Sequence, residues 1–176
     1  MRGGAQCDVT IGPDYPRAPE LDIAAPAGRL TAFVMDSRDS ALFPGVRRLD
    51  NEITRRRDSY GNRLAAAAEE QSVVAPYRRT AWVYAPAASV AQPLPLIIAQ
   101  DGHVYVDILP RALDVLIDQG RVPPMAAVLI DSGGGDAQGS QRGLEYDTLS
   151  GRYSDFVETE VLPRAAREAG LRFTDD

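Results

Sequence analysis

Residues 94–130 read LPLIIAQDGHVYVDILPRALDVLIDQGRVPPMAAVLI, and in this stretch two short apolar runs enclose a helical pattern. Residues 94–99 and 125–130 are near-continuous apolar runs of the kind that is buried on both faces of a parallel sheet. Between them, residues 109–119 carry leucine and isoleucine at helical spacing, and Gly120 follows as a stop signal. A strand, a crossover helix and a second strand form a βαβ unit, which predicts a parallel strand pair with a right-handed connection.

The flanking segments extend this pattern into a larger α/β domain. Residues 29–35 and 79–84 alternate between apolar and polar positions, which predicts two half-buried strands. Residues 153–169 predict a helix with Ser154 or Asp155 as its N-cap and Gly170 beyond its end. The sequence around Phe173 then occupies the position in which the next buried strand is expected to start. We expect an α/β fold with a mixed, mostly parallel sheet.

We expect two regions in the chain. Residues 1–28 are rich in Pro, Gly and Asp without a sustained period, which predicts an irregular N-terminal arm. Residues 29–176 form the α/β domain, with an excursion over its surface at about residues 44–77. Within this excursion a run of four alanines, residues 65–68, is compatible with a helical turn. A final helix without a following strand leaves one edge of a parallel sheet uncovered, so we expect an incomplete domain.

Composition excludes several classes of function. The chain has 176 residues and a formal net charge of −6, which gives no basic surface for nucleic acid. No apolar run is long enough to cross a bilayer, and the N-terminus lacks the apolar core of a secretory signal, so we expect no membrane partner. The compartment stays open: cytoplasmic as given, exported if a leader precedes this chain. One cysteine (Cys7) and one histidine (His103) exclude an internal disulfide and a multi-histidine metal site, and we expect no cofactor.

Two loops follow the carboxyl ends of the buried strands, where α/β sheets bind ligands. The first begins with Asp101, Gly102 and His103. An Asp-Gly pair at a strand end turns the backbone sharply and leaves amide N–H groups facing the cleft, which suits an oxyanion. The same pair is more often only a turn. The His103 side chain is a weak candidate for a general base, because the sequence shows neither an orienting acid nor an adjacent nucleophile.

The second loop, residues 131–147, is rich in glycine but lacks the Lys-Ser/Thr ending of a phosphate loop, which disfavours nucleotide binding and a flavodoxin-like function. Ser140 is not set in a Gly-x-Ser-x-Gly motif, and we interpret it as a loop hydroxyl. Arg142 and Glu145 are the more informative residues. A guanidinium beside a carboxylate favours a structural ion pair that orders the loop, and contact with a polar or anionic substrate is the second interpretation.

From residue 79 onward the sequence resembles the first half of the enterochelin esterase-like group of α/β hydrolases, of the esterase D type. Three features carry the resemblance. They are the strand that ends in Asp101-Gly102, the Arg-x-Pro-Pro element ahead of a strand ending in Ile130-Asp131, and the Arg142-x-x-Glu145-Tyr146 element ahead of a helix containing Glu160-x-Leu162-Pro163. The resemblance implies an incomplete α/β-hydrolase sheet and a serine esterase acting on a small-molecule ester.

The resemblance also implies roles for single residues. The backbone N–H of His103 is expected in the oxyanion hole, and Asp101, Gly102, Arg142 and Glu145 are expected near the substrate. The Gly-x-Ser-x-Gly elbow and the acid and histidine of the triad are absent from this sequence. We therefore expect a truncated chain without esterase turnover of its own. The alternative is a non-catalytic α/β binding or assembly module that a partner completes, and the uncovered sheet edge leaves homo-oligomer formation open. The ester itself is not specified.

Overall fold

The computed structural model describes residues 24–48, 73–87, 92–133, 141–146 and 149–174. Its centre is a four-stranded sheet in the order β1-β4-β6-β5, formed by β1 (Arg29–Asp36), β4 (Arg78–Ala85), β6 (Ala126–Ile130) and β5 (Leu96–Gln100). β1 pairs antiparallel with β4, and β4 pairs antiparallel with β6. The mixed sheet expected from the sequence is confirmed. Among the described strands, however, only β5 and β6 pair in parallel, so this part of the sheet is not mostly parallel as expected.

The βαβ unit is present as predicted. β5 leads into a short helix, α3 (Gly102–Tyr105), and then into α4 (Leu109–Asp118), which returns the chain to β6. β5 and β6 pair in parallel from Leu96 opposite Ala126 to Gln100 opposite Ile130. Because the strands are in register at these residues, the segments that follow Gln100 and Ile130 leave the sheet at the same edge.

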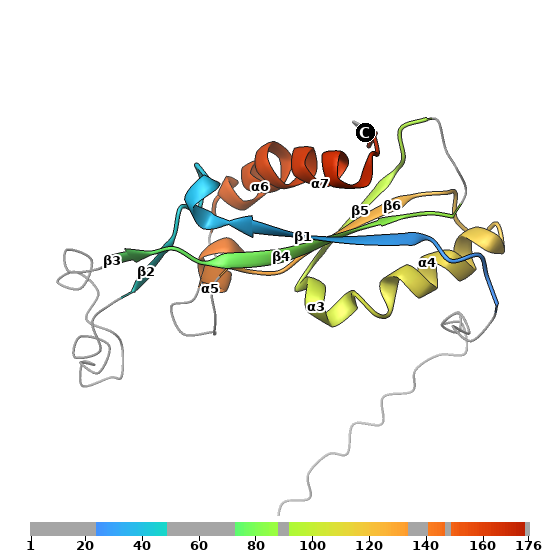
Figure 1. Cartoon of the computed structure of the whole chain (residues 1–176), viewed down its shortest axis with the longest axis horizontal. Coiled ribbons are helices and arrows are strands. Elements are labelled where there is room, and N and C mark those ends of the chain that lie inside the picture. The colour runs from blue at the N-terminus through green and yellow to red at the C-terminus, as the bar shows by residue number, and fades with distance from the viewer. Residues whose placement is uncertain (1–23, 49–72, 88–91, 134–140, 147–148, 175–176) are drawn as a thin grey trace, which may run out of the picture.

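Helices cover both faces of the sheet (Figure 1). The C-terminal helix lies on one face, and α3 and α4 lie on the other. β6 is buried on both sides: Val128 and Ile130 pack towards the C-terminal helix, whereas Ala127 and Leu129 pack towards α4. Continuous burial explains why this strand reads as an unbroken apolar run.

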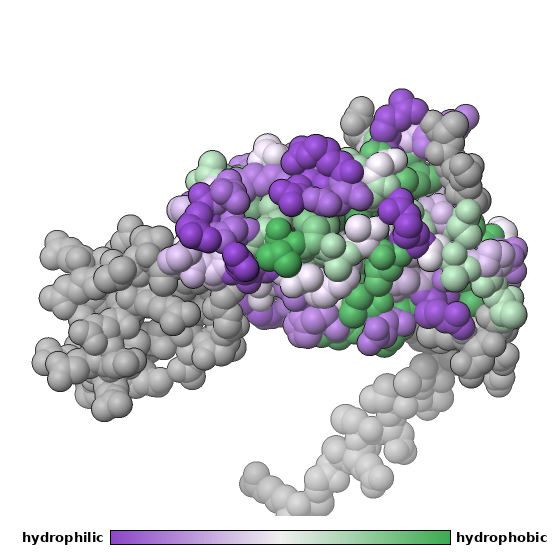
Figure 2. Space-filling model, viewed as in Figure 1, coloured by the Kyte–Doolittle hydropathy of each residue, from purple (hydrophilic) through white to green (hydrophobic). Residues whose placement is uncertain are grey.

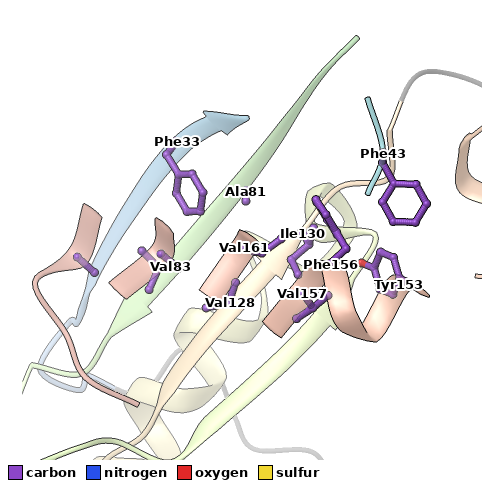
Figure 3. Close-up of a cluster of buried hydrophobic side chains, with 12 residues drawn as sticks. Phe33, Phe43, Ala81, Val83, Val128, Ile130, Tyr153, Phe156, Val157 and Val161 are labelled. Carbon is purple, nitrogen blue, oxygen red and sulfur yellow. The ribbon is translucent and has the colours of Figure 1, made fainter. Parts of the chain in front are cut away.

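The core on the first face joins aromatic and β-branched side chains from the sheet and the C-terminal helix (Figure 3). Phe156 and Val161 of this helix are almost completely buried against Phe33 of β1 and Val128 of β6. Phe43 meets Phe156 edge to face, with the ring centroids 5.2 Å apart. The loop that follows β1 is therefore fastened to the helix as well as to the sheet.

The C-terminal helix differs in detail from the prediction. It begins with α6 (Arg152–Phe156), passes through a π-helical stretch, η2 (Val157–Val161), and ends with α7 (Leu162–Ala169). The predicted cap at Ser154 or Asp155 is wrong, because both residues lie inside the first turn and Gly151 occupies the N-cap position. The predicted end is confirmed: Gly170 adopts a left-handed conformation (φ 66°), a common helix C-terminus.

The C-terminal residues begin to pair with the outer edge of β5. Phe173 forms a parallel bridge with Leu94. The Leu94 N–H donates to the Arg172 carbonyl over 2.8 Å, and the Thr174 N–H donates to the Leu94 carbonyl over 3.0 Å. This pairing agrees with the expectation that a strand starts near Phe173.

The arm and the excursion are described only in part. Of the N-terminal arm, residues 24–28 are described, and the Gly28 N–H donates to the buried carboxylate of Asp114, which also accepts a hydrogen bond from the Tyr84 hydroxyl. The excursion starts and ends in a two-stranded antiparallel ribbon of β2 (Val46–Arg48) and β3 (Val73–Ala75). Residues 65–68, for which a helical turn was expected, lie outside the described residues.

The surface of the face seen in Figure 1 is mixed. Figure 2 shows hydrophilic side chains over the C-terminal helix and hydrophobic surface near the middle of the molecule, in the region of β1. β1 is an edge strand, and its Leu30 and Val34 are exposed. Among the described helices, none combines the length and apolar character that a membrane crossing requires.

Candidate functional site

The candidate site lies where β5 and β6 end. β5 continues through Asp101 into α3, and Asp101 has a left-handed backbone (φ 52°, ψ 50°). It is the only non-glycine residue in the described part of the chain with positive φ. Aspartate tolerates this region better than most residues, and such outliers gather at functional sites. The sharp turn expected at Asp101-Gly102 is present, but Asp101 rather than Gly102 adopts the unusual backbone angles.

Gly102 is required for a different reason, namely close packing against β6. A Cβ atom at this position would lie 2.9 Å from the Ile130 backbone nitrogen and 3.0 Å from the Leu129 backbone carbon. It would also lie 2.9 Å from the Trp82 ring. Only glycine allows α3 to start this close to the strand.

The Asp101 carboxylate is held by Arg142 from α5 (Gln141–Tyr146). The Arg142 Nε and one terminal nitrogen donate to the two carboxylate oxygens over 3.0 and 2.7 Å, which makes a bidentate pair. The guanidinium also lies 5.0 Å from the centre of the Tyr146 ring, within the range of a cation–π contact. The hydrogen bonds from Arg142 lower the pKa of Asp101 below its ordinary value of 3.8. The first loop and α5 are thus joined at a partly exposed ion pair.

This ion pair predicts a dependence on acid. Because the folded-state pKa of Asp101 is depressed, its contribution to stability is complete above the ordinary value of 3.8 and is lost as the pH falls through the lower folded-state value. We expect Asp101→Asn to reduce the free energy of unfolding at neutral pH. Below pH 3.8 the variant is expected to lose less stability with falling pH than the wild type does. Urea unfolding at a series of pH values measures this. The exposed Asp118→Asn serves as control, and equal acid profiles for both variants would contradict the prediction.

His103 and Asp131 meet across the gap between the two strand ends. One carboxylate oxygen of Asp131, the residue directly after β6, accepts a hydrogen bond from the His103 backbone N–H over 2.8 Å. The same oxygen lies 2.8 Å from Nδ1 of the His103 ring. The N–H for which the family resemblance implied a place in an oxyanion hole is therefore bonded to a carboxylate in this structure.

Glu145 occupies a different place from the one expected of a substrate-binding residue. Its side chain is completely buried and forms an ion pair with Arg79 of β4, whose side chain is 2% exposed. The Glu145 carboxylate also accepts a hydrogen bond from the Gly133 N–H over 3.3 Å. Arg79 in turn donates to the Asp131 carbonyl over 3.4 Å and to the Tyr77 hydroxyl over 2.7 Å. Glu145 thus supports the second loop from beneath and has no surface for a ligand.

The sequence favoured an ion pair between Arg142 and Glu145, but in the structure each of them pairs with a residue of another element. Arg142 is paired with Asp101 and Glu145 with Arg79, although both belong to α5. Arg142 holds the first loop through Asp101, and Glu145 holds the second loop through Arg79 and Gly133. The structure therefore brings Asp101, Gly102, His103 and Arg142 together where β5 and β6 end, whereas the Glu145 carboxylate is buried against Arg79.

Sequence reasoning missed Asp131 and Arg79. Asp131 is the first polar residue after a fully apolar strand, and that position was a usable signal. Arg79 lies in phase with Ala81 and Val83, which face the core, and a charge at such a position needs a buried partner, so this phase was the signal that was overlooked. Ser140, interpreted as a loop hydroxyl, lies outside the described residues.

An open hollow adjoins the site along β5. Its volume is about 620 Å³, and its lining combines apolar and polar groups: Ile98, Ala99, Gln100, Asp101, Tyr105 and Leu109. Within the described ranges no group of three or more histidine, cysteine or acidic side chains could hold a metal ion. The site therefore offers hydrogen-bonding and charged groups beside an apolar surface.

Comparison with known proteins identifies the fold. No protein-family model and no curated protein matches this sequence. Among solved structures, the ferric enterobactin esterase from Salmonella typhimurium superposes with a TM-score of 0.54 over 93% of this chain, at 21% sequence identity. This chain has a partial α/β-hydrolase fold. It spans 32% of the length of the Salmonella enzyme, so the similarity covers only part of that protein.

Other esterases are similar over less of the chain or at lower scores. The enterobactin esterase from Shigella flexneri, solved in the presence of enterobactin, matches with a TM-score of 0.46 and 24% identity over 54% of this chain and 24% of its own. A ferulic acid esterase matches with a TM-score of 0.39 and 14% identity over 86% of this chain and 46% of its own. These two solved structures, like the Salmonella protein, are esterases.

Proposed function

We propose that this chain forms the carbonyl-binding wall of a serine carboxylic ester hydrolase. The observation that carries the proposal is the turn from β5 into α3, which brings Asp101, Gly102 and His103 to the carboxyl edge of an α/β-hydrolase sheet beside Arg142. Ligands of α/β sheets bind outside this edge. The adjoining hollow supplies apolar surface for the acyl or alcohol part of an ester.

The chemistry assigned to this wall is the stabilisation of negative charge. When a nucleophile attacks an ester, the carbonyl oxygen becomes an oxyanion, and a backbone N–H aimed at it stabilises the transition state. The His103 N–H performs this role once it exchanges the Asp131 carboxylate for the ester oxygen. The Arg142 guanidinium, bound to Asp101 and partly exposed, offers a positive group to a polar or anionic substrate.

The attacking serine is not among residues 1–176 in this proposal. No Gly-x-Ser-x-Gly motif occurs in the sequence. Removing the nucleophile from a catalytic group of this kind removes the covalent route, because its members act as a unit. We expect the purified polypeptide to show no serine-dependent turnover of an activated ester such as p-nitrophenyl butyrate. A burst of product that Ser140→Ala abolishes would overturn this part of the proposal.

The binding role is tested by NMR titration of the ¹⁵N-labelled polypeptide with a p-nitrobenzyl phosphonate monoester, which resembles a tetrahedral oxyanion. We expect shift changes to concentrate at the amides of Gly102, His103 and Asp131. Arg142→Ala is expected to weaken binding about tenfold, the loss of one charge-assisted hydrogen bond. The exposed Arg121→Ala is the matched control. Equal affinities of the two variants, or shifts that map elsewhere, would refute the assignment of this wall.

A further inference from the structure

Asp114 of α4 is a buried acid whose described contacts include no counter-ion. The residue is 6% exposed and lies between the apolar Leu113 and Val115. Its Oδ1 atom accepts two hydrogen bonds, one from the Gly28 N–H and one from the Tyr84 hydroxyl, each over 2.8 Å. Among the described residues, both donors are neutral and no arginine pairs with Asp114. Buried carboxylates normally have a cationic partner, because burial removes the hydration that stabilises the charge.

The other carboxylate oxygen of Asp114, Oδ2, is available to a ligand. The described part of the chain gives it no hydrogen-bond partner. Burial and the hydrogen bond to Asp114 raise the pKa of Tyr84, so the hydroxyl stays protonated and keeps donating to Oδ1. Gly28 is fixed as well, because a Cβ atom there would collide with the Ala85 carbonyl oxygen and the Tyr84 ring. These contacts hold the carboxylate by one oxygen and leave the other open to binding.

A hollow of about 330 Å³ lies beside Asp114. Asp118, one helical turn further along α4, contributes a second carboxylate to its lining. The rest of the lining is apolar or aromatic: Pro26, Tyr84, Ala87, Ile117 and Pro124. The two acids thus meet no basic residue in this lining. Small-molecule sites range from about 300 to 1,000 Å³, so the hollow suits a compact organic ligand.

The hollow lies at the opposite edge of the sheet from the candidate site. Tyr84 is paired with Ala127 near the start of β6, whereas the candidate site follows Ile130 at the end of this strand. The hollow adjoins the C-terminal half of α4, on the face of the sheet away from the C-terminal helix (Figure 1). A ligand bound here is therefore separate from the ester of the proposed function.

We infer that this hollow binds a small primary amine in its protonated form. The ammonium group donates to Asp114 Oδ2 and to the Asp118 carboxylate, and the carbon chain packs against Ile117 and Pro124. An ammonium group suits a carboxylate with one available oxygen, whereas a guanidinium prefers both oxygens of one carboxylate. The site suits a metal ion less well, because Ca²⁺ takes about six to eight oxygen ligands and this lining offers two acids among apolar side chains.

NMR titration of the ¹⁵N-labelled polypeptide with n-butylammonium chloride tests this inference. The titration is made at constant ionic strength and about pH 7, where an ordinary alkylamine is protonated. We expect shift changes at the amides of Gly28, Ile117 and Asp118, none at Gly102 and His103, and a Kd in the millimolar range, as suits a ligand of so few atoms. n-Butanol has the same carbon chain without the charge, and it is expected to bind at least about tenfold more weakly.

Three variants separate ligand binding from a structural role of Asp114. Asp114→Asn keeps an acceptor for Gly28 and Tyr84 but removes the charge, and it is expected to weaken butylammonium binding about tenfold or more. Asp118 is exposed, so Asp118→Asn is expected to leave the fold intact and to weaken binding about threefold. The exposed Asp107→Asn is the matched control and is expected to bind like the wild type.

Equal affinities for butylammonium and butanol would overturn the inference, and so would equal affinities of all three variants or shift changes that map away from α4. Asp114 would then serve only as an anchor for Gly28 and Tyr84. If Asp114→Asn fails to fold, the comparison of Asp118→Asn with Asp107→Asn decides the question. No ester is present in this experiment, so its failure is distinct from failure of the proposed ester binding.

Discussion

Replacing Glu145 by alanine is expected to lower the free energy of unfolding by about 3–5 kcal/mol, because it leaves the buried Arg79 guanidinium without its counter-ion. Both side chains are almost fully removed from solvent, so water cannot replace the lost partner. The guanidinium would keep its hydrogen bond to the Tyr77 hydroxyl and its position 4.4 Å from the centre of the Phe156 ring. These neutral contacts do not neutralise a charge in the interior of the domain.

Urea unfolding, followed by far-UV circular dichroism, measures this effect. The matched control is Glu168→Ala, which breaks the exposed pair with Arg164 on α7 and is expected to cost at most about 0.5 kcal/mol. A double variant, Arg79→Met with Glu145→Leu, removes both charges and keeps the volume apolar. It is expected to recover most of the loss, since apolar pairs often replace buried ion pairs without cost. A Glu145→Ala variant that unfolds at the same urea concentration as Glu168→Ala would contradict this account of the buried ion pair.

The same pair explains why α5 was difficult to interpret from sequence. Arg142 and Glu145 are three positions apart, a spacing at which side chains of a helix are neighbours, and an ion pair between them was the natural expectation. The structure separates them because each finds a partner on another element, Asp101 after β5 and Arg79 on β4. Which of two available partners a charge selects depends on burial, and burial is not visible in a single sequence.

Other parts of the fold were predictable. The strands β5 and β6 and the helix α4 follow directly from two apolar runs around a helical period, and the two strands pair in parallel as a βαβ unit requires. The left-handed end of the C-terminal helix follows from Gly170. The start of this helix did not, because Gly151 stands at the N-cap without a side chain to mark it. The π-helical stretch at Val157–Val161 likewise left no recognisable pattern in the sequence.

The contact between His103 and Asp131 could not be predicted from the sequence. The two residues follow the parallel neighbours β5 and β6, and the topology alone placed both of them where these strands end. Only β6 is buried along its whole length, because β5 is an edge strand with Ile98 exposed. That they share a hydrogen bond depends on α3, which turns His103 back towards β6 and which was interpreted as a loop. A helical turn of four residues is too short to show a period, so its effect on the direction of the ring was inaccessible from the sequence.

The position of α3 depends on the absence of a side chain at Gly102. We expect Gly102→Ala to lower the free energy of unfolding by about 1–3 kcal/mol, which is the usual effect of forcing a methyl group into packed surroundings. Two of the three atoms that the methyl group would approach within about 3 Å belong to the β6 backbone, which cannot move aside by changing a rotamer. The strain is relieved only if α3 moves away from β6, and this separates the His103 N–H from the Asp131 carboxylate.

The expected consequence is therefore a combined one: lower stability in urea, and a shift of the His103 amide signal together with loss of its protection against hydrogen exchange. Gly151→Ala is the matched control, because no atom lies within 4 Å of a Cβ at that position and its φ of −75° suits any residue. It is expected to leave both readouts unchanged or to raise the stability by up to about 1 kcal/mol. If Gly102→Ala behaved like Gly151→Ala, close packing against β6 would not be what holds the turn that carries Asp101 and His103, and their place at the edge of the sheet would need another cause.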